Sequence, residues 1–103
     1  MTKKASYVSF SDFYPFYLSE HGNRTCRRLH FIGSSVGLLC LLQALESLNF
    51  WWLLAGLLAG YGFAWAGHFF FEKNRPATFT HPLYSFVGDW VMWKDMLTGK
   101  IPL

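Results

Sequence analysis

Apolar residues dominate the middle of the chain in two uninterrupted stretches. No charged residue occurs at positions 29–45 or 47–71, and only Glu46 separates the two stretches. A helix needs roughly 20 mostly apolar residues to cross a bilayer. The pattern therefore predicts two membrane-spanning helices over residues 29–45 and 50–71, joined by a short turn.

Shorter helical segments are expected on either side of these stretches. In residues 11–21 aromatic side chains recur at helical spacing, with Ser11 as the expected N-cap. Residues 82–98 begin with a proline and are followed by a glycine, as helices often are. Both segments are too short to span a membrane, so we expect amphipathic helices at the interface. The larger apolar side chains of the second segment share one face: Leu83, Phe86, Val87, Trp90, Val91 and Leu97.

The predicted fold is all-α. Residues 1–103 form a single membrane domain, a two-helix hairpin with interfacial helices at both ends. Gly33 and Gly37 in the first span, and Gly56 and Gly60 in the second, have the GxxxG spacing of closely packed helices. This spacing indicates a tight hairpin, and the same glycine faces favour a homodimer.

Charge places the chain in the membrane with a defined orientation. All nine Lys and Arg residues lie outside positions 29–72, so they flank the apolar block and are absent from its turn. By the positive-inside rule both termini are cytoplasmic, in the inner membrane if the protein is bacterial. Charged residues are 15% of the chain against about 25% in soluble domains, which argues against a nucleic-acid partner. Cys26 and Cys40 are expected to be free thiols.

The histidines are the chemically informative residues. An antiparallel hairpin brings His30, which opens the first span, to the depth of His68, which closes the second. His21 precedes His30 by a short connection, and His81 follows the second span on the same side. Any one such histidine is more often structural than a ligand, but four at one end favour a metal site. Glu72, four residues after His68, adds a carboxylate on the same helical face.

Imidazoles with a carboxylate suit Fe(II), Zn(II) or Mn(II), and an open-sided site of this kind favours non-haem Fe(II) and O2 chemistry. A second interpretation from a different class is a non-enzymatic membrane module whose histidines are structural or bind haem. Haem would need two opposed histidines in an apolar slot, for which His30 and His68 are the candidates.

Two motifs resemble the 2-hydroxy fatty acid dioxygenase family, whose fungal member acts in phytosphingosine degradation. They are His21-Gly22-Asn23 followed by His30, and the stretch from Gly67 to Ala77 of GHxxFEKxxPA form. The chain is similar to a short, bacterial-type member over roughly residues 10–97. The resemblance implies Fe(II)-dependent oxidation of a 2-hydroxy fatty acid with O2, shortening it by one carbon (α-oxidation). It implies His21, His30 and His68 as metal ligands and Glu72 as the catalytic carboxylate, whereas His81 matches no family histidine and is only a further candidate.

The expected substrate fits the expected membrane position. A long acyl chain partitions into the bilayer while its carboxylate and 2-hydroxyl stay at the interface, where the histidines lie. The two oxygens can chelate one metal ion and leave a position for O2. Arg75 or Arg28 are the candidates to neutralise the carboxylate.

Overall fold

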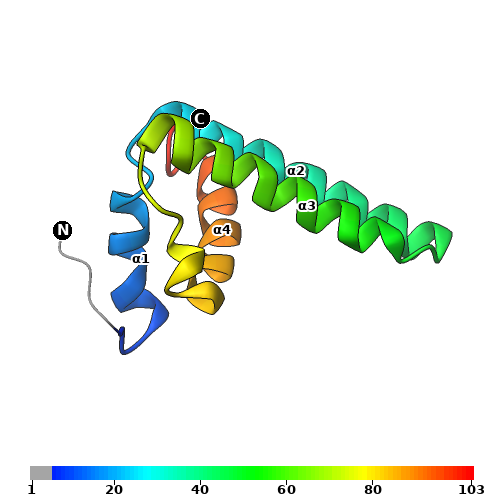
Figure 1. Cartoon of the computed structure of the whole chain (residues 1–103), viewed down its shortest axis with the longest axis horizontal. Helices are drawn as coiled ribbons and strands as arrows, with labels where there is room; N and C mark the ends of the chain where they lie inside the picture. Colours follow the sequence, from blue (N-terminus) through cyan, green and yellow to red (C-terminus); the bar gives the residue numbers. More distant parts are fainter. Residues whose placement is uncertain (1–5) are drawn as a thin grey trace.

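The chain folds into four α-helices with short connections, which confirms the all-α prediction (Figure 1). The structure is a computed structural model, and it describes residues 6–103. A π-helical turn, η1, continues the third helix, and a 3-10 turn, η2, precedes the fourth. In chain order the elements are α1 Phe10–Ser19, α2 Arg24–Ser47, α3 Trp51–Ala66, η1 Gly67–Glu72, η2 Ala77–Phe79 and α4 Pro82–Leu97.

Helices α2 and α3 form the long antiparallel hairpin, which extends away from the other two helices (Figure 1). Its backbones approach closely at the glycines. A Cβ placed on Gly33 would lie 2.9 Å from the Cβ of Phe63 and 3.0 Å from the carbonyl oxygen of Gly60. Gly56 is similarly close to Gly37 of α2. The predicted glycine faces therefore join α2 to α3 within one chain, and a homodimer through them stays a prediction.

Helices α1 and α4 lie side by side across the end of the hairpin where α2 begins and η1 ends (Figure 1). Aromatic side chains of α1 pack against α4 in a small core. Tyr17 is fully buried, and a Cβ on Gly88 would lie 2.9 Å from its ring, so α4 approaches α1 closely at this glycine. The buried apolar members of this core are Phe13, Phe16, Tyr17, Ala77, Met92 and Met96.

Helix α4 leaves several large apolar side chains exposed. Its buried face includes Ser85 and Asp95, whereas Leu83 on the expected apolar face is 73% exposed. Phe86 and Leu97 on that face are exposed as well. These three apolar side chains point away from the protein, whereas Met92 and Met96 are buried together with Ser85, Gly88 and Asp95.

Two helical segments, Arg24–Ser47 and Trp51–Glu72, are long and apolar enough to cross a membrane. Few of their residues are buried: 22% of the apolar window of the first segment and 17% of that of the second. Core helices of a soluble protein are mostly buried, and these two are not.

Helix boundaries differ from the expected ones at three places. The N-cap of α1 is Ser9, not Ser11, and its hydroxyl accepts a hydrogen bond from the backbone N–H of Asp12 at 3.2 Å. Helix α2 begins at Arg24, five residues before the predicted first span, so Arg24, Arg27 and Arg28 belong to the helix. The last turn of the second span widens into the π-helix η1.

Candidate metal centre

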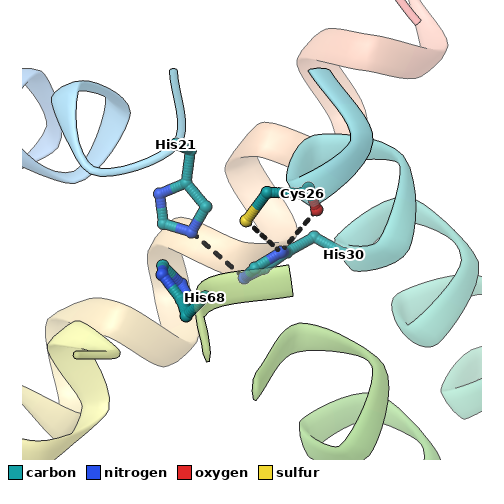
Figure 2. Close-up of side chains that lie close together, drawn as sticks. All are labelled: His21, Cys26, His30 and His68. Atoms are coloured by element: carbon teal, nitrogen blue, oxygen red, sulfur yellow. Dashed lines mark hydrogen bonds between the residues drawn. The ribbon is translucent and has the colours of Figure 1, made fainter. Parts of the chain in front are cut away.

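Three buried histidines from three segments meet at the end of the hairpin where α2 begins and η1 ends (Figure 2). His21 lies in the connection between α1 and α2, His30 lies in α2 and His68 lies in η1. Their ring centroids are 4.4 to 4.9 Å apart, and each pair is arranged edge to face. The structure therefore brings together the three histidines predicted as metal ligands.

The Nδ1 atom of each ring faces an oxygen that can only accept a hydrogen bond. His21 Nδ1 lies 2.6 Å from the carbonyl oxygen of Tyr17, and His30 Nδ1 lies 2.9 Å from that of Cys26. Both Nδ1 atoms therefore carry the proton and donate it. A neutral imidazole protonated at Nδ1 keeps a free lone pair at Nε2.

The third histidine is fixed in the same way by Asn74. The Nδ2 group of Asn74 donates to the backbone oxygen of Glu20 at 3.1 Å and to its carboxylate at 3.2 Å. The amide oxygen of Asn74 is consequently the atom that faces His68 Nδ1, at 2.7 Å. His68 thus donates from Nδ1 and also has its lone pair at Nε2.

The free lone pairs converge. Nε2 of His21 lies 3.0 Å from Nε2 of His30, and two unprotonated nitrogens at that distance repel each other unless a cation or proton lies between them. Two imidazoles bound at a right angle to one ion, with metal–nitrogen bonds of about 2.1 Å, have nitrogens about 3.0 Å apart. Hydrogen bonds from the outer nitrogen to protein oxygens are the usual support of metal-bound histidines. The arrangement fits a metal ion.

Electrostatics favour an ion over a proton at this point. Burial, together with the neighbouring imidazoles of His30 and His68, lowers the pKa of His21 well below its ordinary value. His21 is therefore neutral at physiological pH, as a metal ligand must be.

Cys26 is the fourth member of the group. The donor atoms of His21, Cys26, His30 and His68 all lie within 4.8 Å of one another, and all four residues are buried. The Sγ of Cys26 lies 3.7 Å from Nδ1 of His30, on the side of the ring that also faces the Cys26 carbonyl (Figure 2). Cys26 is a free thiol, as expected, so the group could hold a metal ion with nitrogen and sulfur donors.

Capping interactions position the connection that carries His21. The side chain of Asn23 accepts a hydrogen bond from the backbone N–H of Cys26 at 3.1 Å and begins α2. The guanidinium of Arg27 donates to the carbonyls of His21 and Gly22 at 3.0 and 2.9 Å. The first motif, His21-Gly22-Asn23, is therefore a helix entry that directs His21 back towards α2.

The π-helix positions His68. The backbone N–H of Lys73 bonds the carbonyl of His68, and Lys73 adopts a left-handed conformation with φ 57°. This sharp stop turns Asn74 back to His68, where its backbone N–H also donates to the His68 carbonyl at 3.1 Å. Single π-helical turns are frequent at functional sites because they shift side chains out of the regular helical register.

Glu72, Arg28 and Arg75, the other predicted site residues, are not members of the metal group. Glu72 is half-buried and accepts a hydrogen bond from the backbone N–H of Asn23, so it ties η1 to the start of α2. Arg28 and Arg75 are exposed. Arg28 donates to the carbonyl of Leu103 at 3.4 Å, and the Arg75 guanidinium lies over the ring of Phe79 at 5.5 Å.

His81 lies outside the metal group found among residues 6–103. It caps α4, and its ring packs against Tyr7 and Phe13 at centroid distances of 5.1 and 5.5 Å. Thr80 lies 2.9 Å from its Nδ1. His81 was predicted to lie at the same end of the hairpin as the other three histidines. Its ring packs against aromatic side chains of the α1 core and is not part of the metal group.

Two residues of the centre were missed in the sequence. Cys26 precedes His30 by four residues, a spacing that places both on one helical face only because α2 begins at Arg24 and not at residue 29. Asn74 follows His68 by six residues and meets it only because the helix widens and stops at Lys73. No regular helical periodicity would have predicted that contact.

A second polar pair lies next to the centre. The ring of Tyr17 stacks on His21 with a centroid distance of 4.1 Å, and the Tyr17 hydroxyl donates to Asp89 of α4 at 2.5 Å. Burial raises the pKa of Asp89 to about 7, against the opposing effect of the Tyr17 hydrogen bond. Asp89 therefore carries a proton part of the time at neutral pH.

Comparison with known protein families agrees with this geometry. The family model described as 2-hydroxy-palmitic acid dioxygenase Mpo1-like matches residues 7–101, which includes all four members of the metal group. The chain belongs to this Mpo1-like family. Neither a curated protein nor a solved structure matches the chain. The resemblance noted in the sequence motifs is thus confirmed at the level of the family.

Proposed function

We propose that this Mpo1-like chain is a membrane-embedded, Fe(II)-dependent dioxygenase that oxidises 2-hydroxy fatty acids and shortens them by one carbon. The observation that carries the proposal is the convergence of three buried imidazoles, with the Nε2 atoms of His21 and His30 3.0 Å apart, in a chain from a dioxygenase family. Iron is the metal that connects such a centre with the oxygenase chemistry of the family name.

The residues present suit a resident Fe(II) ion. His21, His30 and His68 would hold it through Nε2, and three nitrogen ligands leave coordination positions for other groups. Fe(II) bound there supplies the redox chemistry with O2 and an electrophilic site for the carboxylate and 2-hydroxyl oxygens of the substrate. The hydrogen bonds at Nδ1 hold the three rings in position before metal and substrate arrive.

A membrane location follows from what the fold exposes. Trp51 is 76% exposed and Phe70 73% exposed, and the apolar face of α4 also points outward. In water this surface would favour aggregation, whereas in a bilayer the hydrocarbon covers it. Within residues 6–103 the basic residues lie at the start of α2, directly after η1, and in or after α4, so this end of the hairpin and both termini are proposed to face the cytoplasm.

The end of the hairpin that carries α1 and α4 is a suitable place for the polar headgroup of a fatty acid. The metal group lies where the hairpin meets α1 and α4, so a substrate entering from the bilayer would reach it with its polar end. Arg28 and Arg75 are exposed at this end and are available to attract a carboxylate. Their part in substrate binding stays a prediction.

Glu72 is proposed as a proton-transfer carboxylate, although its contact with the Asn23 backbone gives it a structural part too. Glu72→Gln keeps an oxygen for the Asn23 N–H but removes the base. A catalytic role predicts normal iron content and a loss of at least tenfold in turnover. Iron content and turnover that both match the unchanged protein would leave Glu72 with the structural part alone.

The geometry does not favour haem. The ring centroids of His30 and His68 are 4.9 Å apart and arranged edge to face, with His21 against both. A porphyrin needs two opposed rings with a slot for the macrocycle between them. The three rings close on one point instead, which suits a single ion.

Oxygen uptake tests the proposed activity. Protein purified in mild detergent and loaded with Fe(II) should consume O2 with 2-hydroxypalmitic acid and yield a product one carbon shorter by mass spectrometry. A 3-hydroxy acid of equal length should be inactive, because its hydroxyl closes a larger chelate ring and moves C2 away from the metal. Equal turnover of both acids would contradict chelation, and no turnover of either by iron-loaded protein would contradict the activity.

A further inference from the structure

A cavity of about 340 Å³ lies between α2, α3 and α4. It runs along the glycine faces of the hairpin, and Gly33, Gly37, Gly56 and Gly60 all line it. Because these residues have no side chains, the floor of the cavity is backbone. The cavity starts at the metal group, since His30 belongs to both.

The polar residues of the cavity all lie at one end. Ser34 of α2, Tyr61 of α3 and Asp89 of α4 line it close to His30. Beyond Ser34 along α2, and before Tyr61 along α3, the lining is glycine and leucine, as far as Leu41 and Leu53. The cavity therefore has a polar head beside the metal group and an apolar tail that follows the hairpin.

The length of the cavity suits a long chain. His30 and Leu41 are eleven residues apart on one helix, which corresponds to about 16 Å. A ligand that fills it must have a polar group at one end and an extended apolar chain at the other. Each methylene group that leaves water for such a site favours binding, so a long chain binds better than a short one.

We infer that this cavity is the acyl-chain site of the enzyme. The carboxylate and hydroxyl end of a 2-hydroxy fatty acid lies at His30 and Asp89, and its methyl end lies between Leu41 and Leu53. The inference rests on the proposed function, because it takes its ligand class from there. It assigns the hairpin a second role: the glycines that bring α2 and α3 together also form the floor on which the substrate chain lies.

Two neighbouring leucines provide a matched pair of variants. Leu57 lines the cavity, whereas Leu58 lies on another face of α3 beside Gly62. Both are exposed, at 52% and 66%, so a larger side chain can be accommodated at either position without disturbing a core. Leu57→Trp should obstruct the middle of the cavity, and Leu58→Trp should leave it open.

Photolabelling measures occupancy without requiring turnover. The probe is 2-hydroxypalmitic acid with a diazirine at its methyl end, added to iron-loaded protein in phosphatidylcholine vesicles, with labelled residues identified by mass spectrometry. We expect label around Leu41 and Leu53, reduced at least tenfold by Leu57→Trp and within twofold of normal in Leu58→Trp. Iron content and helical circular dichroism, unchanged in both variants, show that they are folded.

The outcomes separate the two proposals. Label spread evenly over both faces of α3, or equal effects of the two tryptophans, overturns the acyl-chain site. Label at Leu41 and Leu53 that excess phosphatidylcholine with the same diazirine reproduces also overturns it, because the cavity is then a general lipid groove. Label that is confined to the cavity and displaced by unlabelled 2-hydroxypalmitic acid supports the site, even if absent turnover has already contradicted the proposed oxidation.

Discussion

The outer nitrogens of the three histidines determine what the inner ones can do. Each Nδ1 donates to an oxygen that the fold holds in place, from Tyr17, Cys26 or Asn74. Two of these acceptors are backbone carbonyls, each four residues before its histidine, and a side-chain substitution cannot remove them. Asn74 is a side chain, so it is the one support of the centre that mutation can test directly.

Asn74→Ala should weaken metal binding. Without the acceptor, His68 is free to rotate or to move its proton to Nε2, which removes the lone pair. Loss of such supports typically costs 10–100-fold in metal affinity. Competition with a chelator of known affinity measures the effect, and Asn74→Asp, which keeps an acceptor, should retain more of the affinity. An affinity in Asn74→Ala equal to that of the unchanged protein would show that the tautomer is fixed otherwise.

Asp89 should make the stability depend on pH in a defined direction. Its pKa of about 7 lies above the ordinary value of 3.8, so the folded state favours the protonated form. That contribution is complete in acid and is lost as the pH rises from about 4 through 7. Asp89→Asn cannot ionise, so its melting temperature relative to the unchanged protein should rise between pH 5 and 8. A difference that stays constant over this range would show that Asp89 is not protonated in the fold.

At the scale of the helices, the sequence predicted which helices form and in what order better than it predicted which face of each helix is buried. Uninterrupted apolar stretches are sufficient to predict α2 and α3, and the glycine spacing predicts that they pack. The periodicity of α4 defined its apolar face, but not which way that face points. In a bilayer both the protein interior and the surroundings are apolar, so hydrophobicity alone does not tell the buried face from the exposed one.

Some residues of the metal centre could likewise be predicted from the sequence, and others could not. His21, His30 and His68 were predictable because an antiparallel hairpin puts the ends of its helices at one depth. Cys26 and Asn74 depend on local geometry, a helix that begins five residues earlier than expected and a π-helical turn. An earlier helix start and a single π-helical turn change only a few backbone hydrogen bonds, so the hydrophobic pattern of the sequence does not reveal them.

The close packing of α2 and α3 at Gly33 can be tested by measuring the thermal stability of a Gly33 variant. A Cβ there would lie 2.9 Å from that of Phe63 and 3.0 Å from the Gly60 oxygen, so Gly33→Ala must push the helices apart. Overpacking of this kind costs about 1–3 kcal/mol. We expect a lower melting temperature in detergent, together with weaker metal binding because His30 moves away from His68. Gly62→Ala, where nothing lies within 4 Å, is the control and should be neutral. Equal stability of the two variants would contradict the packing.

At the scale of the whole molecule, the candidate metal group and the apolar turn lie at opposite ends of one hairpin. The apolar end carries Phe50 and Trp51 at its turn, and the other end carries the metal group, α1 and α4 (Figure 1). Such a division suits an enzyme whose substrate resides in the bilayer while its reacting carbons stay at the interface. In the proposed orientation the end with the metal group faces the cytoplasm.

Reporter fusions test this orientation. A reporter active only in the cytoplasm should be active when fused after Leu103, and one active only outside the cytoplasm should be inactive there. The same reporters inserted at the turn, after Leu48, should give the opposite result. Identical compartments for the two positions would mean that the hairpin does not cross the membrane.

Iron stoichiometry tests the central claim, the three-histidine centre, most directly. Protein purified in mild detergent without oxygen, loaded with Fe(II) and desalted, should hold one iron per chain. His21→Ala, His30→Ala and His68→Ala should each lose most of it, while His81→Ala, a histidine of the same end outside the group, should keep it. Full iron retention in all three, or a loss in His81→Ala equal to theirs, would contradict the account.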